Sequence, residues 1–166
     1  FAQVDDEDYD YLMQWKWHRT TITTRVNKNI YAQRMQYYKD GNGNSKRFQV
    51  LMHRQILKIS DKNIHIDHIN HNGLDNTKSN LRQCTKQQNR FNSTQRRISS
   101  SKYIGVKFHK CKDKKKPSII RTSWVARIGV NGKRISKSFK TEYEAAIWRD
   151  EMAKKLHGEF ANLNFK

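Results

Sequence analysis

Residues that build covalent or metal-rich scaffolds are scarce in this chain. Of its 166 residues, two are cysteines, Cys84 and Cys111, and one is a proline. The cysteines form no Cys-x-x-Cys pair and are too few for a thiolate zinc site, so we expect no structural zinc and two unpaired thiols. Apolar residues make up 35% of the chain, and no apolar run approaches membrane-spanning length. The composition therefore predicts small modules with aromatic cores.

Acidic residues are also scarce. The chain holds 15 Asp and Glu against 34 Lys and Arg, for a formal net charge of +19. Solubility does not require so large a charge, which instead predicts an anionic partner. No basic helix with a strong apolar face is present, and this favours nucleic acid over a membrane surface.

Five of the acidic residues lie together near the start of the chain: Asp5, Asp6, Glu7, Asp8 and Asp10. Such a cluster can bind a metal ion, but negative charge also suits the first turn of a helix. Tyr11, Leu12 and Trp15 follow at helical spacing, so we favour a helix start.

A small β-rich region is predicted next, because Thr, Tyr, Val and Ile are frequent there. The expected elements are strands over 17–26 and 30–38 joined at 27–29, a turn at 41–44, a strand from Phe48 to Met52, and a short helix over 53–58.

A strand, a long polar loop, a second strand and a helix follow. Strands are predicted over 63–69 and 81–84, and the loop 70–80 between them consists largely of Asn, Gly and Asp. Thr85 and Gln88 form a Thr-x-x-Gln capping box, which predicts a helix from Lys86.

This unit carries side chains suited to phosphodiester hydrolysis. His68 can take a proton from water near neutral pH. Asp67 and Asn89 offer the hard oxygen ligands that Mg²⁺ or Mn²⁺ accepts, and two protein ligands leave room for water and phosphate. Adjacent residues of an ideal strand point to opposite faces. Asp67 and His68 therefore cooperate only if the strand ends or twists there, or if substrate lies across its edge.

The same stretch resembles HNH endonucleases of the phage homing type. The residues that carry the resemblance are Asp67-His68-Ile69-Asn70, Leu74-Asp75-Asn76, Asn80-Leu81-Arg82, Thr85 and Asn89. It implies a ββα-metal fold with one divalent ion and without zinc-binding cysteines. It also implies that His68 is the general base, that Asp67 and Asn89 are metal ligands, and that Asn80, in the catalytic set, positions the loop and His68.

The roles of two further histidines stay open. His71 stands where the HNH family commonly has Gly, and it either contacts DNA or caps the loop. His53 is interpreted as a packing or phosphate-contact residue near a helix start.

A basic linker is predicted over residues 96–102. Its Arg96 and Arg97 are expected to contact DNA phosphates. The region after it predicts three antiparallel strands and one helix. The expected elements are strands over 103–109, 124–128 and 134–139, a basic loop over 110–118 with Lys114, Lys115 and Lys116, an Asn131-Gly132 hairpin turn, and a helix from the Thr141–Glu144 capping box to Gly158.

Alternation along these strands predicts two different faces. The face under the helix is expected to hold Val106, Phe108, Trp124, Ala126, Ile128 and Phe139. The opposite face is expected to hold Lys107, His109, Arg127 and Lys137, with Lys133 and Arg134 near the hairpin turn. Because this face is almost wholly cationic, we predict contact with nucleic acid rather than simple solvation.

Residues 101–165 resemble an AP2 DNA-binding domain. The resemblance is carried by Tyr103-Ile104-Gly105-Val106, Trp124-Val125-Ala126-Arg127-Ile128, Phe139-Lys140-Thr141, Glu144-Ala145-Ala146 and Leu163-Asn164-Phe165. It implies a sheet that lies in the major groove, with Lys107, His109, Arg127 and Lys133 facing the bases. Ile104 and His109 replace residues that are usually Arg, so no site preference is transferred.

These features predict an α+β chain with an N-terminal β-rich region (1–52), a ββα-metal HNH nuclease (53–95), a basic linker (96–102) and an AP2-like domain (103–166). The predicted function is site-specific DNA cleavage of the homing type, one nick per monomer, with Mg²⁺ or Mn²⁺ and a His base. Double-stranded DNA is the expected partner, with no membrane and no small-molecule cofactor. The chain is expected to act as a monomer or homodimer in the host-cell cytoplasm of a phage or mobile element.

Two alternatives stay open. One is an AP2-type DNA-binding regulator with a vestigial nuclease unit, although such a regulator would have no reason to keep Asp67, His68 and Asn89 together. The other is an RNA-binding protein, which the AP2-like sheet disfavours.

Overall fold

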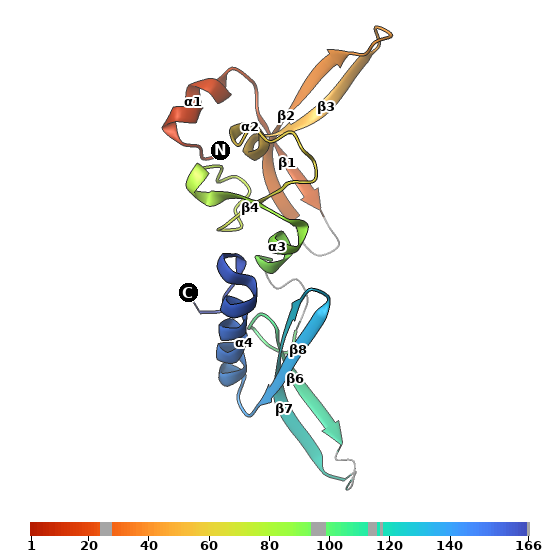
Figure 1. The fold of residues 1–166 in the computed structure, drawn as a ribbon, viewed down its shortest axis with the longest axis vertical. Helices are drawn as coiled ribbons and strands as arrows, with labels where there is room; N and C mark the ends of the chain where they lie inside the picture. The colour runs from red at the N-terminus through yellow and green to blue at the C-terminus, as the bar shows by residue number, and fades with distance from the viewer. Residues whose placement is uncertain (24–27, 94–98, 113–115, 117, 166) are drawn as a thin grey trace. The chain divides into compact units, whose positions relative to one another are not determined.

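The computed structural model describes residues 1–23, 28–93, 99–112, 116 and 118–165. The chain divides into two compact units, Phe1–Asn89 and Arg90–Lys166, each with its own helices and strands (Figure 1). The sheets are small and antiparallel, which confirms the predicted mixture of α and β structure. None of the described helices is long and apolar enough to cross a membrane.

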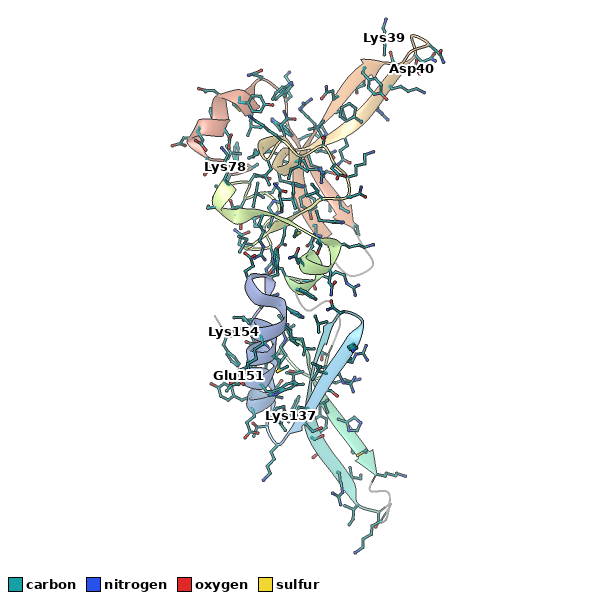
Figure 2. The ribbon with its side chains drawn as sticks, viewed as in Figure 1. Lys39, Asp40, Lys78, Lys137, Glu151 and Lys154 are labelled. Carbon is teal, nitrogen blue, oxygen red and sulfur yellow. The ribbon has the colours of Figure 1, made fainter. Side chains whose placement is uncertain are left out.

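Three strands in the order β1-β2-β3 form the sheet of the first unit. Its elements are α1 (Asp6–Met13), β1 (His18–Thr23), β2 (Lys28–Lys39), β3 (Ser45–Leu51) and α2 (Met52–Ile56). These strands and helices were predicted, although β2 already begins at Lys28, and residues 24–27 lie outside the described part. Asp40 closes the β2–β3 hairpin, because its carboxylate accepts backbone hydrogen bonds from Asn42 and Asn44 (Figure 2).

The core of this unit joins segments that are far apart in sequence. Its buried members are Leu12, Ala32, Met52, Ile56 and Leu81. Arg34 is buried as well, with its guanidinium carbon 4.4 Å from the ring centroid of Trp15 and with a hydrogen bond to Gln55. Aromatic faces and hydrogen bonds offset the cost of burying this charge. The half-buried ring of Trp15 therefore packs against Arg34 within this unit.

A two-stranded ribbon and a helix complete the strand–loop–strand–helix order that was predicted. The elements are β4 (His65–His68), the 3-10 turn η1 (Lys78–Asn80), β5 (Leu81–Cys84) and α3 (Lys86–Phe91). β4 begins two residues later than expected, because Asp61 accepts hydrogen bonds from the backbone of Asn63 and Ile64 and holds them in a turn. The predicted capping box is confirmed, since Thr85 and Gln88 each accept from the other's backbone N–H.

The second unit contains a three-stranded sheet in the order β6-β7-β8, with one long helix against it. Its elements are β6 (Val106–Lys112), β7 (Ile120–Val130), β8 (Lys133–Phe139), α4 (Glu142–His157) and the 3-10 turn η2 (Gly158–Phe160). Asn131 and Gly132 both have positive φ, as the predicted hairpin turn requires. The Thr141–Glu144 capping box is also confirmed.

The β6–β7 hairpin differs from the sequence prediction at both ends. β6 starts at Val106 rather than Tyr103, because Gly105 has a φ of +75° and a Cβ there would lie 2.7 Å from the carbonyl oxygen of Arg127. At the other end, strand pairing continues to Lys112 and Ile120, so the expected loop over 110–118 is shorter than predicted.

Residues 99–102, expected to belong to a linker, contact the second unit instead. The hydroxyl of Ser99 donates to the carbonyl of Val106, and the hydroxyl of Ser100 accepts from the backbone of Phe108. Ser101 is buried. Residues 94–98, with the predicted phosphate contacts Arg96 and Arg97, lie outside the described residues.

The register of the sheet corrects the prediction for two lysines. Lys137 pairs with Ala126, and Lys133 lies on the same face of β8, four residues away. Ala126 is wholly buried in the core formed with α4. Lys133 and Lys137 therefore belong to the helix side of the sheet and not to the opposite face. Sequence spacing already implied this, because Lys137 and Phe139 are two residues apart and must share a face.

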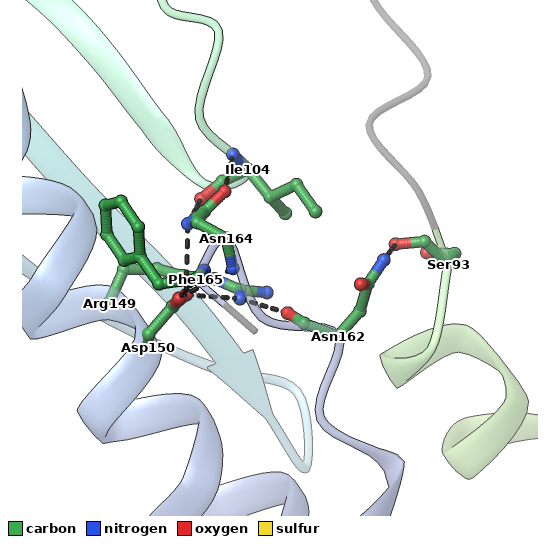
Figure 3. Close-up of polar contacts among 7 residues, drawn as sticks. All are labelled: Ser93, Ile104, Arg149, Asp150, Asn162, Asn164 and Phe165. Atoms are coloured by element: carbon green, nitrogen blue, oxygen red, sulfur yellow. Dashed lines mark hydrogen bonds and ion pairs between the residues drawn. The ribbon is translucent and has the colours of Figure 1, made fainter. Parts of the chain in front are cut away.

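A buried ion pair holds the end of the chain onto α4 (Figure 3). Asp150 accepts hydrogen bonds from Arg149, from the backbone N–H groups of Asn164 and Phe165, and from the Asn164 side chain. Arg149 also donates to the carbonyl of Asn162. The side chain of Asn164 in turn accepts from the backbone of Ile104 and donates to its carbonyl.

Replacing Asp150 with Ala is expected to destabilise the second unit by about 3–5 kcal/mol, because it leaves the buried Arg149 charge without its carboxylate. Calorimetric unfolding of the full chain measures this. Glu151→Ala, which removes an exposed neighbour on the same helix (Figure 2), is the matched control and should stay within about 0.5 kcal/mol. Equal losses in the two variants would contradict the role of the buried pair.

Candidate active site

The loop between β4 and β5 is held by the buried side chain of Asn80. Its Oδ1 accepts from the backbone of Asn70 at 2.9 Å, and its Nδ2 donates to the carbonyl of Asp75 at 2.8 Å. Its backbone carbonyl accepts from Ile69, the residue after His68. Asn80 thus connects the loop to the end of β4. Its burial and these bonds suit a residue that positions the loop rather than one that faces solvent.

Short polar side chains stabilise the rest of the loop. Asn70 accepts from the backbone of Asn72 and donates to Asp75 at 2.6 Å, while Asp75 also accepts from the backbone and hydroxyl of Thr77. Burial acts to raise the pKa of Asp75, but these donors hold it below its ordinary value. The abundance of Asn and Asp in this loop therefore reflects local side-chain to backbone bonding.

His71 adopts a backbone conformation that glycine adopts without strain. Its φ is +65°, and its N–H donates to the carbonyl of His68 at 2.9 Å. This accounts for the position at which the chain departs from the HNH pattern, where Gly is common. His71 therefore contributes a turn directly after the candidate base.

The N-terminal segment is fastened to the far end of the same loop. The backbone of Gln3 bonds to Leu74 and Asn76. The Nζ of Lys78 lies 2.5 Å from Glu7 and 3.1 Å from Asp8 (Figure 2). Asp5, Glu7 and Asp8 are close enough together to suggest a metal site, and no other such group of His, Cys or acidic side chains occurs among the described residues. The amine of Lys78 occupies this cluster, so we retain the helix-start interpretation.

His68, the candidate base, is the last residue of β4 and is buried. Burial lowers the pKa of its imidazole below the ordinary value, although the Asn76 side chain and the carboxylates of Asp67 and Asp75 act in the opposite direction. The imidazole is therefore neutral at neutral pH, which is the form that can accept a proton.

Two rings that the sequence did not connect with His68 lie against it. The ring centroid of His53 on α2 is 5.1 Å away, and that of Tyr31 on β2 is 5.8 Å away. The sequence offered no signal for this contact, because both residues come from elements that precede the loop. Of the two roles left open for His53, packing and phosphate contact, its burial favours packing, but its contact with His68 was not predicted.

Asp67, a candidate metal ligand, is buried and paired with the residue opposite it on β5. Its Oδ2 accepts from Nε and an Nη of Arg82 at 3.0 and 2.7 Å. Strand alternation places this pair on one face of the ribbon, whereas His68 and its partner Leu81 lie on the other. Alternation thus predicts that Asp67 and His68 diverge, and because β4 ends at His68, a substrate can reach both residues at the end of the strand.

Asn89, the other candidate ligand, lies in α3, the helix that follows β5. The link between Asn89 and Asp67 is Cys84, whose thiol pKa is raised to about 11 by burial and also by the nearby carboxylate of Asp67. The backbone N–H of Asn89 acts on the same thiol. The carboxylate of Asp67 and the backbone of Asn89 thus both lie near this buried sulfur. The side chains of Asp67, which is buried, and of Asn89, which is half-buried, carry hard oxygen donors of the kind that a divalent ion such as Mg²⁺ prefers.

This stretch of the chain has a recognisable counterpart among known proteins. Residues 58–91 match the model of the HNH endonuclease family. We call this stretch the HNH segment, and it includes Asp67, His68, Asn80 and Asn89.

Over 102 residues, or 61% of its length, the chain is 39% identical to a protein of Acanthamoeba polyphaga mimivirus named as an uncharacterized HNH endonuclease. The match covers 47% of that relative, so the chain spans about half the length of the curated relative that it matches. No solved structure is a significant match.

The loop of the HNH segment approaches the first unit's sheet closely at Gly73. A Cβ at this position would lie 2.3 Å from the carbonyl oxygen of Ile30 and 2.7 Å from the ring of Tyr31. Backbone cannot move aside as a flexible side chain can, so any larger residue must displace the loop.

Gly73→Ala is therefore expected to lower the rate of DNA cleavage about 100-fold, since displacing a catalytic group by about 1 Å has an effect of that size. A single-turnover assay on plasmid DNA measures the rate. The matched control is Gly41→Ala in the β2–β3 turn, where an added Cβ meets no atom within 4 Å. A Gly73→Ala variant that cuts like wild type would contradict this close packing.

Outside the HNH segment, four of the predicted DNA contacts share the face of the second sheet away from α4: Lys107, His109, Arg127 and Arg134. All four are exposed. Arg121 also lies on this face, opposite Cys111, and was missed because β7 begins earlier than predicted. Lys116 is exposed between β6 and β7, while Lys114 and Lys115 lie outside the described residues.

Proposed function

We propose that this chain is a metal-dependent DNA endonuclease that hydrolyses phosphodiester bonds with His68 as general base. The observation that supports this best is the buried, neutral imidazole at the end of β4, preceded in the strand by the buried carboxylate of Asp67 and followed in α3 by the amide of Asn89. These residues lie in the HNH segment in the order β4, loop, β5 and α3. We propose that this order corresponds to a ββα-metal fold.

In this mechanism His68 accepts the proton of the water that attacks phosphorus. Asn80 holds the loop that ends β4, so the imidazole keeps its place as the proton moves. Arg82, beside Asp67, adds positive charge where the phosphate becomes more negative.

The proposed ligands of one divalent ion are Asp67 and Asn89. A bound Mg²⁺ or Mn²⁺ supplies a Lewis acid for the phosphate and for the leaving 3′ oxygen. Products with 5′-phosphate and 3′-hydroxyl ends are expected.

We propose further that the second unit is an AP2-like domain that supplies site recognition, as in a homing endonuclease of a phage or another mobile element. Its exposed basic face matches the charge of duplex DNA, and a β-sheet of this kind can enter the major groove. The chain carries one proposed catalytic site, so each monomer is expected to nick one strand, and a double-strand break requires a homodimer or a second event.

The test is cleavage of supercoiled plasmid carrying the DNA that flanks the chain's own gene, with Mg²⁺, with Mn²⁺ and with EDTA. Metal-dependent conversion to nicked circles supports the proposal. Binding of equal strength with and without metal, together with no cutting, would instead favour the DNA-binding regulator. Preferential binding of RNA in competition with duplex DNA would favour an RNA-binding protein.

The role of the exposed basic face in DNA binding can be tested separately. Arg127→Ser is expected to weaken DNA binding in the full chain and to lower the slope of log K against log salt by about one, because one phosphate contact is lost. Fluorescence anisotropy at several salt concentrations measures both effects. Lys133→Ser is the matched control, since Lys133 lies on the helix side of the same sheet. Equal effects in the two variants would contradict the assignment of this face.

A further inference from the structure

Three rings from three separate elements meet at the candidate base. The centroids of His53 and His68 are 5.1 Å apart with ring planes at 89°. Tyr31 lies 5.5 Å from His53 and 5.8 Å from His68. Each ring thus contacts the other two, in the edge-to-face and tilted arrangements that such rings prefer.

His53 is held firmly by the helix that carries it. It is buried on α2 between the core residues Met52 and Ile56. The next residue, Arg54, donates at 2.9 Å to the carbonyl of Ile64, directly before β4. The helix that carries His53 is therefore bonded to the start of the strand that carries His68.

Tyr31 is held from the other side. It lies on the central strand β2, and the close approach of Gly73 brings the loop of the HNH segment against its ring. Rings from a helix and from a sheet thus border the imidazole of His68, in addition to the loop that Asn80 ties down.

A base at the end of a strand needs such support. His68 is the last residue of β4, so no further strand pairing follows it. Its imidazole can rotate about the two side-chain torsions, χ1 and χ2. A general base works only when held within about 0.5 Å and 10–20° of its productive geometry. Burial lowers the pKa of His53 to about 3, helped by nearby His68 and Arg54, so His53 meets His68 as an uncharged ring.

We propose that His53 and Tyr31 are positioning residues that fix the orientation of the His68 imidazole through ring packing. This inference rests on the proposed role of His68 as general base. Neither residue touches the phosphate in this proposal, and each acts through His68 alone.

The experiment is a double-mutant cycle in the full chain, measured by steady-state cleavage of the plasmid over a range of DNA concentrations. His53→Ala is expected to reduce kcat at least 10-fold with little change in KM or in DNA affinity. His53→Phe keeps a ring of similar size and is expected to recover most of the rate. In the His68→Ala background, His53→Ala is expected to cause no further loss.

Multiplicative losses in the double variant, or a change confined to KM, would overturn the proposal, because His53 would then act independently of His68. Failure of His53→Phe to recover the rate would overturn it too, provided that circular dichroism shows a folded chain. Tyr31→Leu is the second variant, and the same pattern is expected of it.

A second measurement separates this proposal from the nuclease activity itself. Nitrogen-15 NMR of the histidine side chains reports the His68 ring directly, without substrate. Its signals are expected to be sharp in wild type and broadened in His53→Ala, whereas those of exposed His109 stay unchanged. Unchanged His68 signals would overturn the positioning role. If the wild-type chain never cuts but His53→Ala still broadens the His68 signals, only the proposed function would be overturned.

Discussion

His68→Ala is expected to lower the single-turnover rate of DNA cleavage by about 10²–10⁴-fold, the range that a positioned general base contributes. DNA affinity should stay near wild type, because His68 is buried at the end of β4 and the exposed basic face lies in the second unit. Cleavage of plasmid DNA, with affinity measured in parallel, tests both statements.

The matched control is His65→Ala, at the other end of β4. His65 lies on the Asp67 face of the ribbon and pairs with Cys84, so it is distant in register from the candidate base. Its loss should change the rate only a few-fold. If His68→Ala cuts as fast as wild type, or if His65→Ala is equally damaging, His68 is not the base.

Asp67→Asn is expected to abolish cleavage at every Mg²⁺ or Mn²⁺ concentration that supports the wild type. The substitution removes the charge that a hard divalent ion prefers, while an amide oxygen can still accept a hydrogen bond from Arg82. Asn is therefore a better choice than Ala, which would leave the Arg82 donors without an acceptor on β4 and destabilise the fold further. Mn²⁺ binding followed by electron paramagnetic resonance should be lost together with activity.

The control for Asp67 is Glu7→Gln in the acidic cluster of the N-terminal segment. Because Lys78 occupies that cluster, its change should leave the metal dependence of cleavage as in wild type. A loss of Mn²⁺ binding in Glu7→Gln but not in Asp67→Asn would move the metal site to the N-terminal cluster and contradict the assignment of Asp67.

Local chemistry made several elements predictable. Both capping boxes, at Thr85–Gln88 and Thr141–Glu144, start the helices that they predicted. The Asn131-Gly132 turn and strand β5 also lie where they were expected. Each of these signals depends on bonds or backbone angles within a few residues, so neighbouring letters of the sequence suffice.

The errors arose where a distant contact sets the outcome. β6 starts late because Gly105 must fit against Arg127, and residues 99–102 bond to β6 instead of forming part of a linker. Lys133 and Lys137 were placed on the wrong face although their spacing from Phe139 indicated the helix side. In that case the information was present in the sequence, and charge was weighed above the period of the strand.

In the candidate site, too, some features could be predicted from the sequence and others only from the folded structure. The sequence by itself was enough to propose which residues carry the chemistry, because Asp67, His68, Asn80 and Asn89 lie in the stretch 58–91 that matches the HNH endonuclease family model. Only the tertiary structure decided how the base is held, since His53 and Tyr31 reach His68 from a helix and a strand that precede it. It also decided that Asp67 pairs with Arg82 on the opposite strand and lies near Cys84. Ring packing and cross-strand pairing depend on folding in three dimensions, and spacing along the chain does not encode them.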